Sequence, residues 1–144
     1  MFGERKPFSK SLHQKNDPQS RRIVKEYFLR HNMPLNDNPN KYGVDLISED
    51  QSLQVEVEHR LVWKDEEFPF DEINVPERKA KFFVENHISY AILSCDYSHI
   101  GLIDGKTIQK YMTNDNLKES SNKYVRQGEY FYKVPKSAFR WDKI

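Results

Sequence analysis

Apolar residues recur along the chain with two different periods, and the change of period predicts where helices give way to strands. Between residues 17 and 32 they recur every three or four positions, which is typical of an amphipathic helix. We expect this helix to begin at Asp17 as N-cap, with Pro18 in the first turn. Its buried face would hold Ser20, Ile23, Val24, Tyr27, Phe28 and His31.

Two short segments, 44–47 and 53–58, alternate apolar and polar side chains with the period of two that indicates β-strands. If residues 49–52 form the turn between them, Leu46 pairs with Val55. The same register places the acids Asp45, Glu56 and Glu58 on the face opposite the aliphatic side chains Val44, Leu46, Leu53, Val55 and Val57. A slip of one residue would mix the two sets, so the pattern predicts its own register.

The second half of the chain predicts one more helix and several strands. Asn74 has the character of an N-cap, with Pro76 in the first turn and Glu77 three residues on, and the buried stripe would be Pro76, Ala80, Phe83 and Val84. Strands are expected at 88–95, 100–104 and 129–134, with a turn at Asp104-Gly105 and a loop over 113–122. The predicted fold class is an α/β domain with a mixed sheet.

Composition limits the class of protein. At 144 residues, the chain suits one domain, which we expect over residues 17–144, preceded by a flexible or loosely docked basic arm over 1–16. No apolar run approaches the roughly 20 residues that a membrane span needs, and the N-terminus lacks a secretory signal. We therefore expect a soluble, cytoplasmic protein without a membrane partner.

Charge is unevenly spread although the net charge is only +1. Residues 1–30 carry eight Lys/Arg against three Asp/Glu, and residues 123–144 carry six against two, so the middle of the chain has a net charge of −8. Basic ends are compatible with phosphate-binding arms, and equally with solubilised termini. The aromatic and basic residues near the C-terminus fit either nucleic-acid contact or a terminal strand docked into the core.

The acids of the two strands suggest metal chemistry. Adjacent carboxylates repel each other, and a cation between them relieves the repulsion. Asp45 and Glu56, together with the Val57 carbonyl and water, would form an oxygen site suited to Mg²⁺ or Mn²⁺. The alternative is a solvated sheet face without a ligand. We interpret His59, on the opposite face, as structural, and Glu26 as a solvent-exposed helix residue.

The succession of a helix, a loop, "GVDLI", a turn, "VEVEH" and a helix with lysines resembles the PD-(D/E)XK nuclease superfamily over roughly residues 17–95. Asp45 matches its first acid, Glu56 its second, and Glu58 stands at the position of its lysine. The resemblance implies a restriction-endonuclease-like core, with a mixed central β-sheet flanked by helices. It also implies a Mg²⁺-dependent DNA endonuclease.

Glu58 departs from the family pattern. Some related enzymes carry E-X-E and use the second carboxylate on metal or water; in others the lysine moves to the following helix, where Lys79 or Lys81 could serve. Of the two we favour Lys79, because we expect the helix to cover the aliphatic side of the strands with its N-terminal turn nearest the sheet's edge. Loss of the lysine would instead fit a catalytically inactive nucleic-acid-binding or assembly module. Cutting both DNA strands with one site would require a homodimer or successive nicks.

Overall fold

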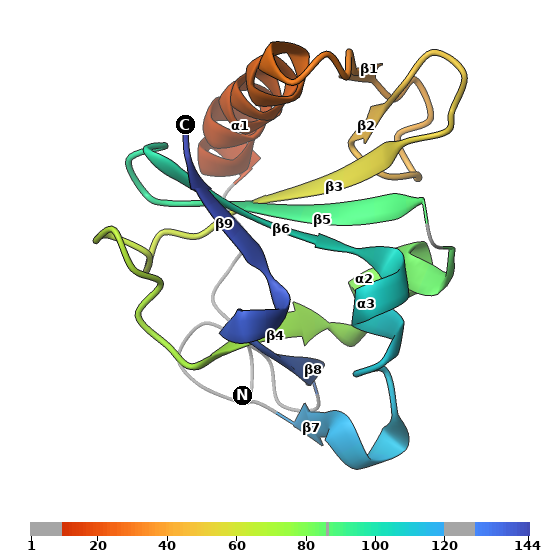
Figure 1. Cartoon of the computed structure of the whole chain (residues 1–144), viewed down its shortest axis with the longest axis vertical. Coiled ribbons are helices and arrows are strands. Elements are labelled where there is room, and N and C mark those ends of the chain that lie inside the picture. The colour runs from red at the N-terminus through yellow and green to blue at the C-terminus, as the bar shows by residue number, and fades with distance from the viewer. Residues whose placement is uncertain (1–9, 86, 120–128) are drawn as a thin grey trace.

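The computed structural model describes residues 10–85, 87–119 and 129–144 (Figure 1), and these form a mixed α/β fold with two sheets. The larger sheet has the strand order β1-β2-β3-β5-β6-β9, and the smaller sheet has the order β4-β8-β7. Within the larger sheet β3 and β5 are parallel, and the other neighbouring strands are antiparallel. The predicted class, α/β with a mixed sheet, is therefore confirmed.

The elements follow one another as α1 (Lys10–Arg30), β1 (Asn36–Asp37), β2 (Leu46–Ile47), β3 (Gln54–His59), β4 (Glu72–Pro76), α2 (Glu77–Ala80), the 3₁₀ turn η1 (Lys81–Val84), β5 (Ile88–Leu93), β6 (His99–Asp104), α3 (Gly105–Gln109), η2 (Asn114–Asn116), β7 (Leu117–Glu119), β8 (Tyr130–Pro135), η3 (Lys136–Ala138) and β9 (Arg140–Lys143).

The β2–β3 hairpin has the register that the alternation predicts. Leu46 is opposite Val55, and the Ser48 backbone N–H donates to the Leu53 carbonyl at 2.9 Å. The turn is stabilised by the Asp50 carboxylate, which accepts hydrogen bonds from the Ser48 hydroxyl, the Ser52 hydroxyl and the Ser52 backbone N–H. A polar side chain that replaces backbone partners in this way is typical of tight turns.

Figure 1 shows the larger sheet between two layers, with α1 on one side and α2, α3 and the smaller sheet on the other. On the α1 side, the described core contains Val24, Tyr27 and Phe28 of the helix, packed on Leu46, Val55, Val57, Ala91, Leu93 and Ile100. On the other side the core includes Val75, Phe83, Ile88, Tyr90, Ile92 and Val134. Val44 belongs to this second core, so its predicted place beside Leu46 is wrong.

The first helix begins earlier than predicted. It starts at Lys10, and Pro18 lies inside it rather than in its first turn. Proline has no backbone N–H and prevents one intrahelical hydrogen bond, but it does not prevent residues on both sides from being helical. The expected boundary between an arm and a domain at residues 16 and 17 therefore falls within a helix, and residues 1–9 of that arm lie outside the described residues.

The second helix also differs from the prediction. Asn74 is not an N-cap but lies in β4, and Pro76 occupies the position before α2. Strand β4 is paired with β8, about sixty positions later in the sequence, and such a long-range pairing leaves no local signal. Ala80 and Phe83 are buried as predicted, whereas Val84 is 63% exposed.

The C-terminal third adds elements that the sequence did not predict. Asp104 accepts a hydrogen bond from the Thr107 N–H and caps α3, so the expected turn at residues 104–105 is a helix start. The predicted loop over 113–122 contains η2 and β7, and its residues 120–122 lie outside the described residues. Strand β9 pairs with β6, and the buried Phe131 and Phe139 favour the docked terminal strand for these two aromatics, whereas Tyr130 and Trp141 are exposed. Tyr124 lies outside the described residues.

No helix within the described part of the chain has the length and apolar character needed to cross a membrane.

Candidate active site

Strand β3 and the residue directly after it carry three charged side chains on the face that looks away from α1. Glu56, Glu58 and Arg60 alternate with Val55, Val57 and His59, in keeping with the two-residue repeat of a strand. His59 is on the α1 side, where it stacks on Tyr97 with ring centres 4.4 Å apart and bonds the Cys95 carbonyl through Nε2. This agrees with the structural role predicted for it.

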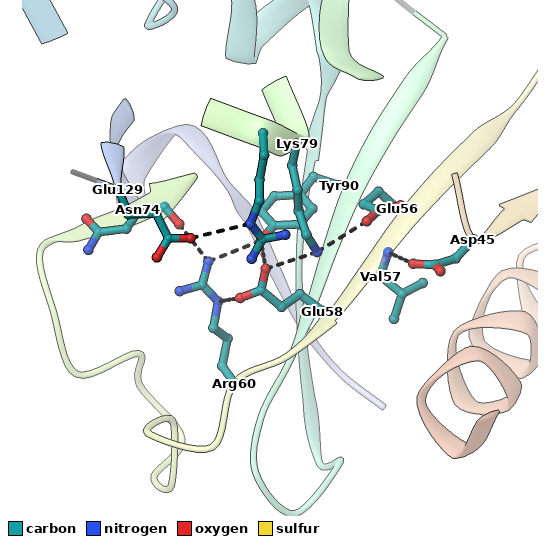
Figure 2. Close-up of polar contacts among 10 residues, drawn as sticks. Asp45, Glu56, Val57, Glu58, Arg60, Asn74, Lys79, Tyr90 and Glu129 are labelled. Carbon is teal, nitrogen blue, oxygen red and sulfur yellow. Dashed lines mark hydrogen bonds and ion pairs between the residues drawn. The ribbon is translucent and has the colours of Figure 1, made fainter. Parts of the chain in front are cut away.

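Asp45, just before β2, reaches the same region as Glu56. Its Oδ2 accepts a hydrogen bond from the Val57 backbone N–H at 2.8 Å, which fixes the carboxylate beside β3 (Figure 2). Glu56 is 7% exposed. Burial raises the pKa of Glu56, the Lys79 ammonium lowers it, and the Asp45 carboxylate raises it again, leaving the pKa at about 7. The predicted juxtaposition of the two acids is therefore present.

Lys79 of α2 provides the cation that contacts Glu56. Its Nζ lies 3.2 Å from Glu56 Oε2 and 3.4 Å from Glu58 Oε1, so one ammonium bridges both carboxylates (Figure 2). Burial alone would lower the pKa of Lys79, but the neighbouring carboxylates raise it and keep the ammonium charged.

Lys81, two residues further on, does not join the cluster. Its side chain lies over the Phe82 ring at 5.2 Å and is exposed to solvent. The two lysines thus separate as their helical spacing of about 200° requires. We expected α2 to cover the aliphatic face of the sheet, with Lys79 reaching the carboxylates around the sheet's edge. Instead α1 covers that face, and α2 lies on the face that carries Glu56 and Glu58.

Glu58 is held by three donors. Arg60 Nε lies 2.8 Å from Oε2, while the Tyr90 hydroxyl and Lys79 approach Oε1. Burial by itself would raise the pKa of Glu58, but the charges of Arg60 and Lys79 and the Tyr90 hydrogen bond outweigh it and lower the pKa to about 2. The Glu58 carboxylate is therefore ionised at neutral pH and already engaged within the protein.

Arg60 and Tyr90 are the members of this cluster that sequence reasoning missed. Arg60 Nη2 donates to the Asn74 carbonyl at 2.8 Å and to the Tyr90 hydroxyl at 3.1 Å. Arg60 could have been found, because it continues the alternation of Glu56 and Glu58 by one more step. Tyr90 could not, since within the apolar run of β5 it has the pattern of an ordinary core residue.

The cluster offers the carboxylates of Asp45 and Glu56 to a divalent cation. Among residues 10–85, 87–119 and 129–144, no three His, Cys, Asp or Glu side chains are arranged to hold a metal together. Asp45 and Glu56 nevertheless lie side by side: burial first, and then the Asp45 carboxylate, raise the pKa of Glu56. A cation between the two carboxylates would relieve their repulsion. Mg²⁺ commonly uses one or two carboxylates and keeps several waters. The pair, with the Val57 carbonyl, fits Mg²⁺ or Mn²⁺.

A cavity of about 430 Å³ lies in a different part of the molecule. It is lined by Trp63, Phe68, His99 and Trp141 and by residues that include the ion pair Glu67–Lys136. Neither Asp45 nor Glu56 borders it. We assign the candidate chemistry to the carboxylate cluster, because there a buried acid, Glu56, lies next to an ammonium and has a raised pKa.

No family model matches the chain, and a search of curated proteins finds no significant match.

Proposed function

We propose that this chain is a metal-dependent DNA endonuclease of the PD-(D/E)XK type. The connectivity supports this proposal. Helix α1 is followed by the antiparallel strands β1, β2 and β3, then by a crossover through β4 and α2, and then by β5 parallel to β3. In the superfamily pattern, the first acid lies on one strand, and the second acid and the lysine lie on the next strand. Here Asp45 lies next to β2, and Glu56 and Glu58 lie on β3.

The observation that carries the proposal is the convergence of Asp45, Glu56 and Lys79 from three separate segments of the chain. A solvated sheet face has no reason to bury Glu56 beside a second carboxylate, because this raises the free energy of the ionised form. Carboxyl groups with strongly shifted pKa values next to a buried ammonium are more typical of catalytic sites than of a solvated sheet face.

Asp45, Glu56 and the Val57 carbonyl would hold Mg²⁺ or Mn²⁺. When bound, the metal would activate water and stabilise negative charge on a phosphodiester. The chain's own contribution is the Lys79 ammonium, which lies next to Glu56 and stays charged at neutral pH. We propose that it orients the attacking water or stabilises the charge that develops on the phosphate. Lys79 would thus do from α2 what a lysine at position 58 does in the family pattern.

The role proposed for Glu58 changes accordingly. Because Arg60, Tyr90 and Lys79 already occupy its two oxygens, Glu58 is a poor candidate for a metal ligand. It fits better as the carboxylate that keeps Lys79 in place. This removes it from the metal ligands and leaves Asp45 and Glu56 as the pair.

The proposal is tested by incubating the protein with supercoiled plasmid and with branched DNA, in the presence of Mg²⁺ or Mn²⁺. We expect Lys79→Ala to reduce the rate of strand cleavage by about 10² or more, as for other groups that stabilise transition-state charge. Lys81→Ala, the matched control, should cleave at nearly the wild-type rate. Nicked circles would indicate single-strand cutting, and linear product would indicate a dimer or successive nicks.

Absence of cleavage by the wild-type protein with both metals would refute the proposal. If that protein still bound DNA, the chain would be the inactive nucleic-acid-binding module that is the alternative.

A further inference from the structure

We propose that Arg60 and Tyr90 are positioning residues, which fix Glu58 and the β4–α2 segment so that the Lys79 ammonium is held next to Glu56. The inference rests on the proposed function, in which Lys79 acts on the reacting phosphate. It assigns a role to two side chains that the family pattern does not include.

The first support is the way in which Glu58 is restrained. Its Oε2 lies 2.8 Å from Arg60 Nε, and its Oε1 receives the Tyr90 hydroxyl, so neither oxygen is free to rotate away (Figure 2). Lys79 approaches the oxygen that Tyr90 fixes, at 3.4 Å. Glu58 therefore holds the Lys79 ammonium in place, and Arg60 and Tyr90 hold Glu58 in place.

The second support is the other end of Arg60. Its Nη2 donates to the Asn74 backbone carbonyl at 2.8 Å, and Asn74 lies in β4. Helix α2 begins directly after β4, and Lys79 is its third residue. Arg60 thus fixes the backbone that leads into α2 as well as the carboxylate that binds the lysine. Asn74 is further restrained by Lys133 of β8, which donates to its Oδ1 at 2.8 Å.

The third support is the place of Tyr90. Its hydroxyl bonds Glu58 and accepts from Arg60, while its ring centre lies 5.9 Å from Lys79 Nζ. The ring also packs against Phe83, with centroids 5.3 Å apart, in the 3₁₀ turn that follows α2. One side chain therefore contacts the lysine, its carboxylate partner and the segment that carries the lysine.

A purely stabilising role explains this arrangement poorly. Buried ion pairs are often no more stabilising than well-packed apolar residues of similar volume. In this cluster a charged fork and a hydroxyl are instead directed at one carboxylate next to the proposed reacting centre. Such outer partners orient the groups that act on a metal or substrate.

The test compares Tyr90→Phe and Arg60→Lys with a matched control, Tyr27→Phe. Tyr27 also donates its hydroxyl to a carboxylate, Asp142, at 2.6 Å, but it lies in the core under α1, on the other side of the sheet. Tyr90→Phe removes the hydroxyl alone. Arg60→Lys keeps the charge but cannot contact Glu58, Asn74 and Tyr90 with one planar group.

Cleavage is measured over a range of DNA concentrations that reaches saturation, below the unfolding temperature of every variant. We expect Tyr90→Phe and Arg60→Lys to lower kcat by about 10- to 100-fold, the usual effect of removing an outer partner. KM for DNA and the affinity for Mn²⁺ should stay within about twofold of wild type, because the lost interaction acts on the transition state. Tyr27→Phe should leave kcat unchanged. Equal kcat values for Tyr90→Phe and Tyr27→Phe would overturn the inference.

A second readout does not depend on cleavage. The rate at which an acylating reagent modifies Lys79 is measured by peptide mass spectrometry, with the exposed Lys81 of the same chain as internal reference. We expect Tyr90→Phe and Arg60→Lys to raise the Lys79 rate severalfold relative to Lys81, and Tyr27→Phe to leave it unchanged. If the wild-type chain cuts no DNA, the proposed function fails. The labelling experiment then tests by itself whether Arg60 and Tyr90 position Lys79. A Lys79-to-Lys81 rate ratio that is the same in the variants as in the wild type would overturn the inference.

Discussion

Glu56→Gln should remove a specific pH dependence of stability from the metal-free protein. Burial and Asp45 raise the pKa of Glu56 in the folded chain to about 7, from 4.5 in the unfolded chain, against the opposing effect of Lys79. The folded state therefore keeps a proton that the unfolded state releases. The contribution of Glu56 to stability is complete below pH 4.5 and is lost as the pH rises through 7.

The magnitude follows from the size of the shift. One pKa unit corresponds to about 1.4 kcal/mol, so the free energy of unfolding of the wild type should fall by about 3 kcal/mol over this window, relative to the variant. Glu58 has the opposite sign, because its lowered pKa of about 2 gives stability above pH 4.5 that is lost only on acidification. Its effect is present in both proteins and cancels in the comparison.

The assay is urea denaturation with a chelator present, at pH values from 5 to 8, on wild type, Glu56→Gln and the control Glu49→Gln. Glu49 is exposed in the β2–β3 turn, so its substitution should change the free energy of unfolding by the same amount at every pH. Between pH 5 and 8, we expect the free energy of unfolding of the wild type to fall by about 2 to 3 kcal/mol relative to that of Glu56→Gln. A difference that does not change with pH would mean that Glu56 is not buried beside Asp45.

Two further substitutions examine the parts of the cluster separately. Asp45→Asn should weaken Mn²⁺ binding at least tenfold in calorimetry, yet change the stability of the metal-free protein by only about 1 kcal/mol, since an amide oxygen can still accept the backbone hydrogen bond. Binding of equal strength in both proteins would exclude Asp45 as a ligand. Arg60→Met should lower the free energy of unfolding by about 2 kcal/mol, because it leaves the partly buried Glu58 carboxylate without its closest cation. A loss below 1 kcal/mol would show that this ion pair is solvated.

The parts of the fold that the sequence predicted correctly depend on neighbours in the chain. The β2–β3 register follows from alternation, because a slip would bury acids and expose aliphatic residues. That register alone brings Asp45 to Glu56, so half of the candidate site was predictable.

The errors have a different physical origin. The sequence Asn74-Val-Pro-Glu77 suits a helix start as well as a strand end, and pairing of β4 with β8 decides between them. Local propensity carries no information on such a pairing. The same pairing moves α2 to the acidic side of the sheet. It therefore determines how Lys79 reaches the site, for which the sequence had suggested a path around the sheet's edge.

The sign of the charge at position 58 is linked to the lysine that reaches the site from α2. Glu58→Lys restores the letters of the family motif, but it would place a new ammonium between Arg60 and Lys79, which now share a carboxylate there. Like charges at this distance repel, so we expect Glu58→Lys to lower both the thermal stability and the cleavage rate. Adding Lys79→Ala removes one of the repelling cations and leaves an ammonium next to Glu56 on β3. The double variant should therefore recover part of the cleavage that each single variant loses. If the double variant is no more active than the less active single variant, a lysine at position 58 cannot replace Lys79. Lys79 would then act in a way that its contacts with Glu56 and Glu58 do not explain.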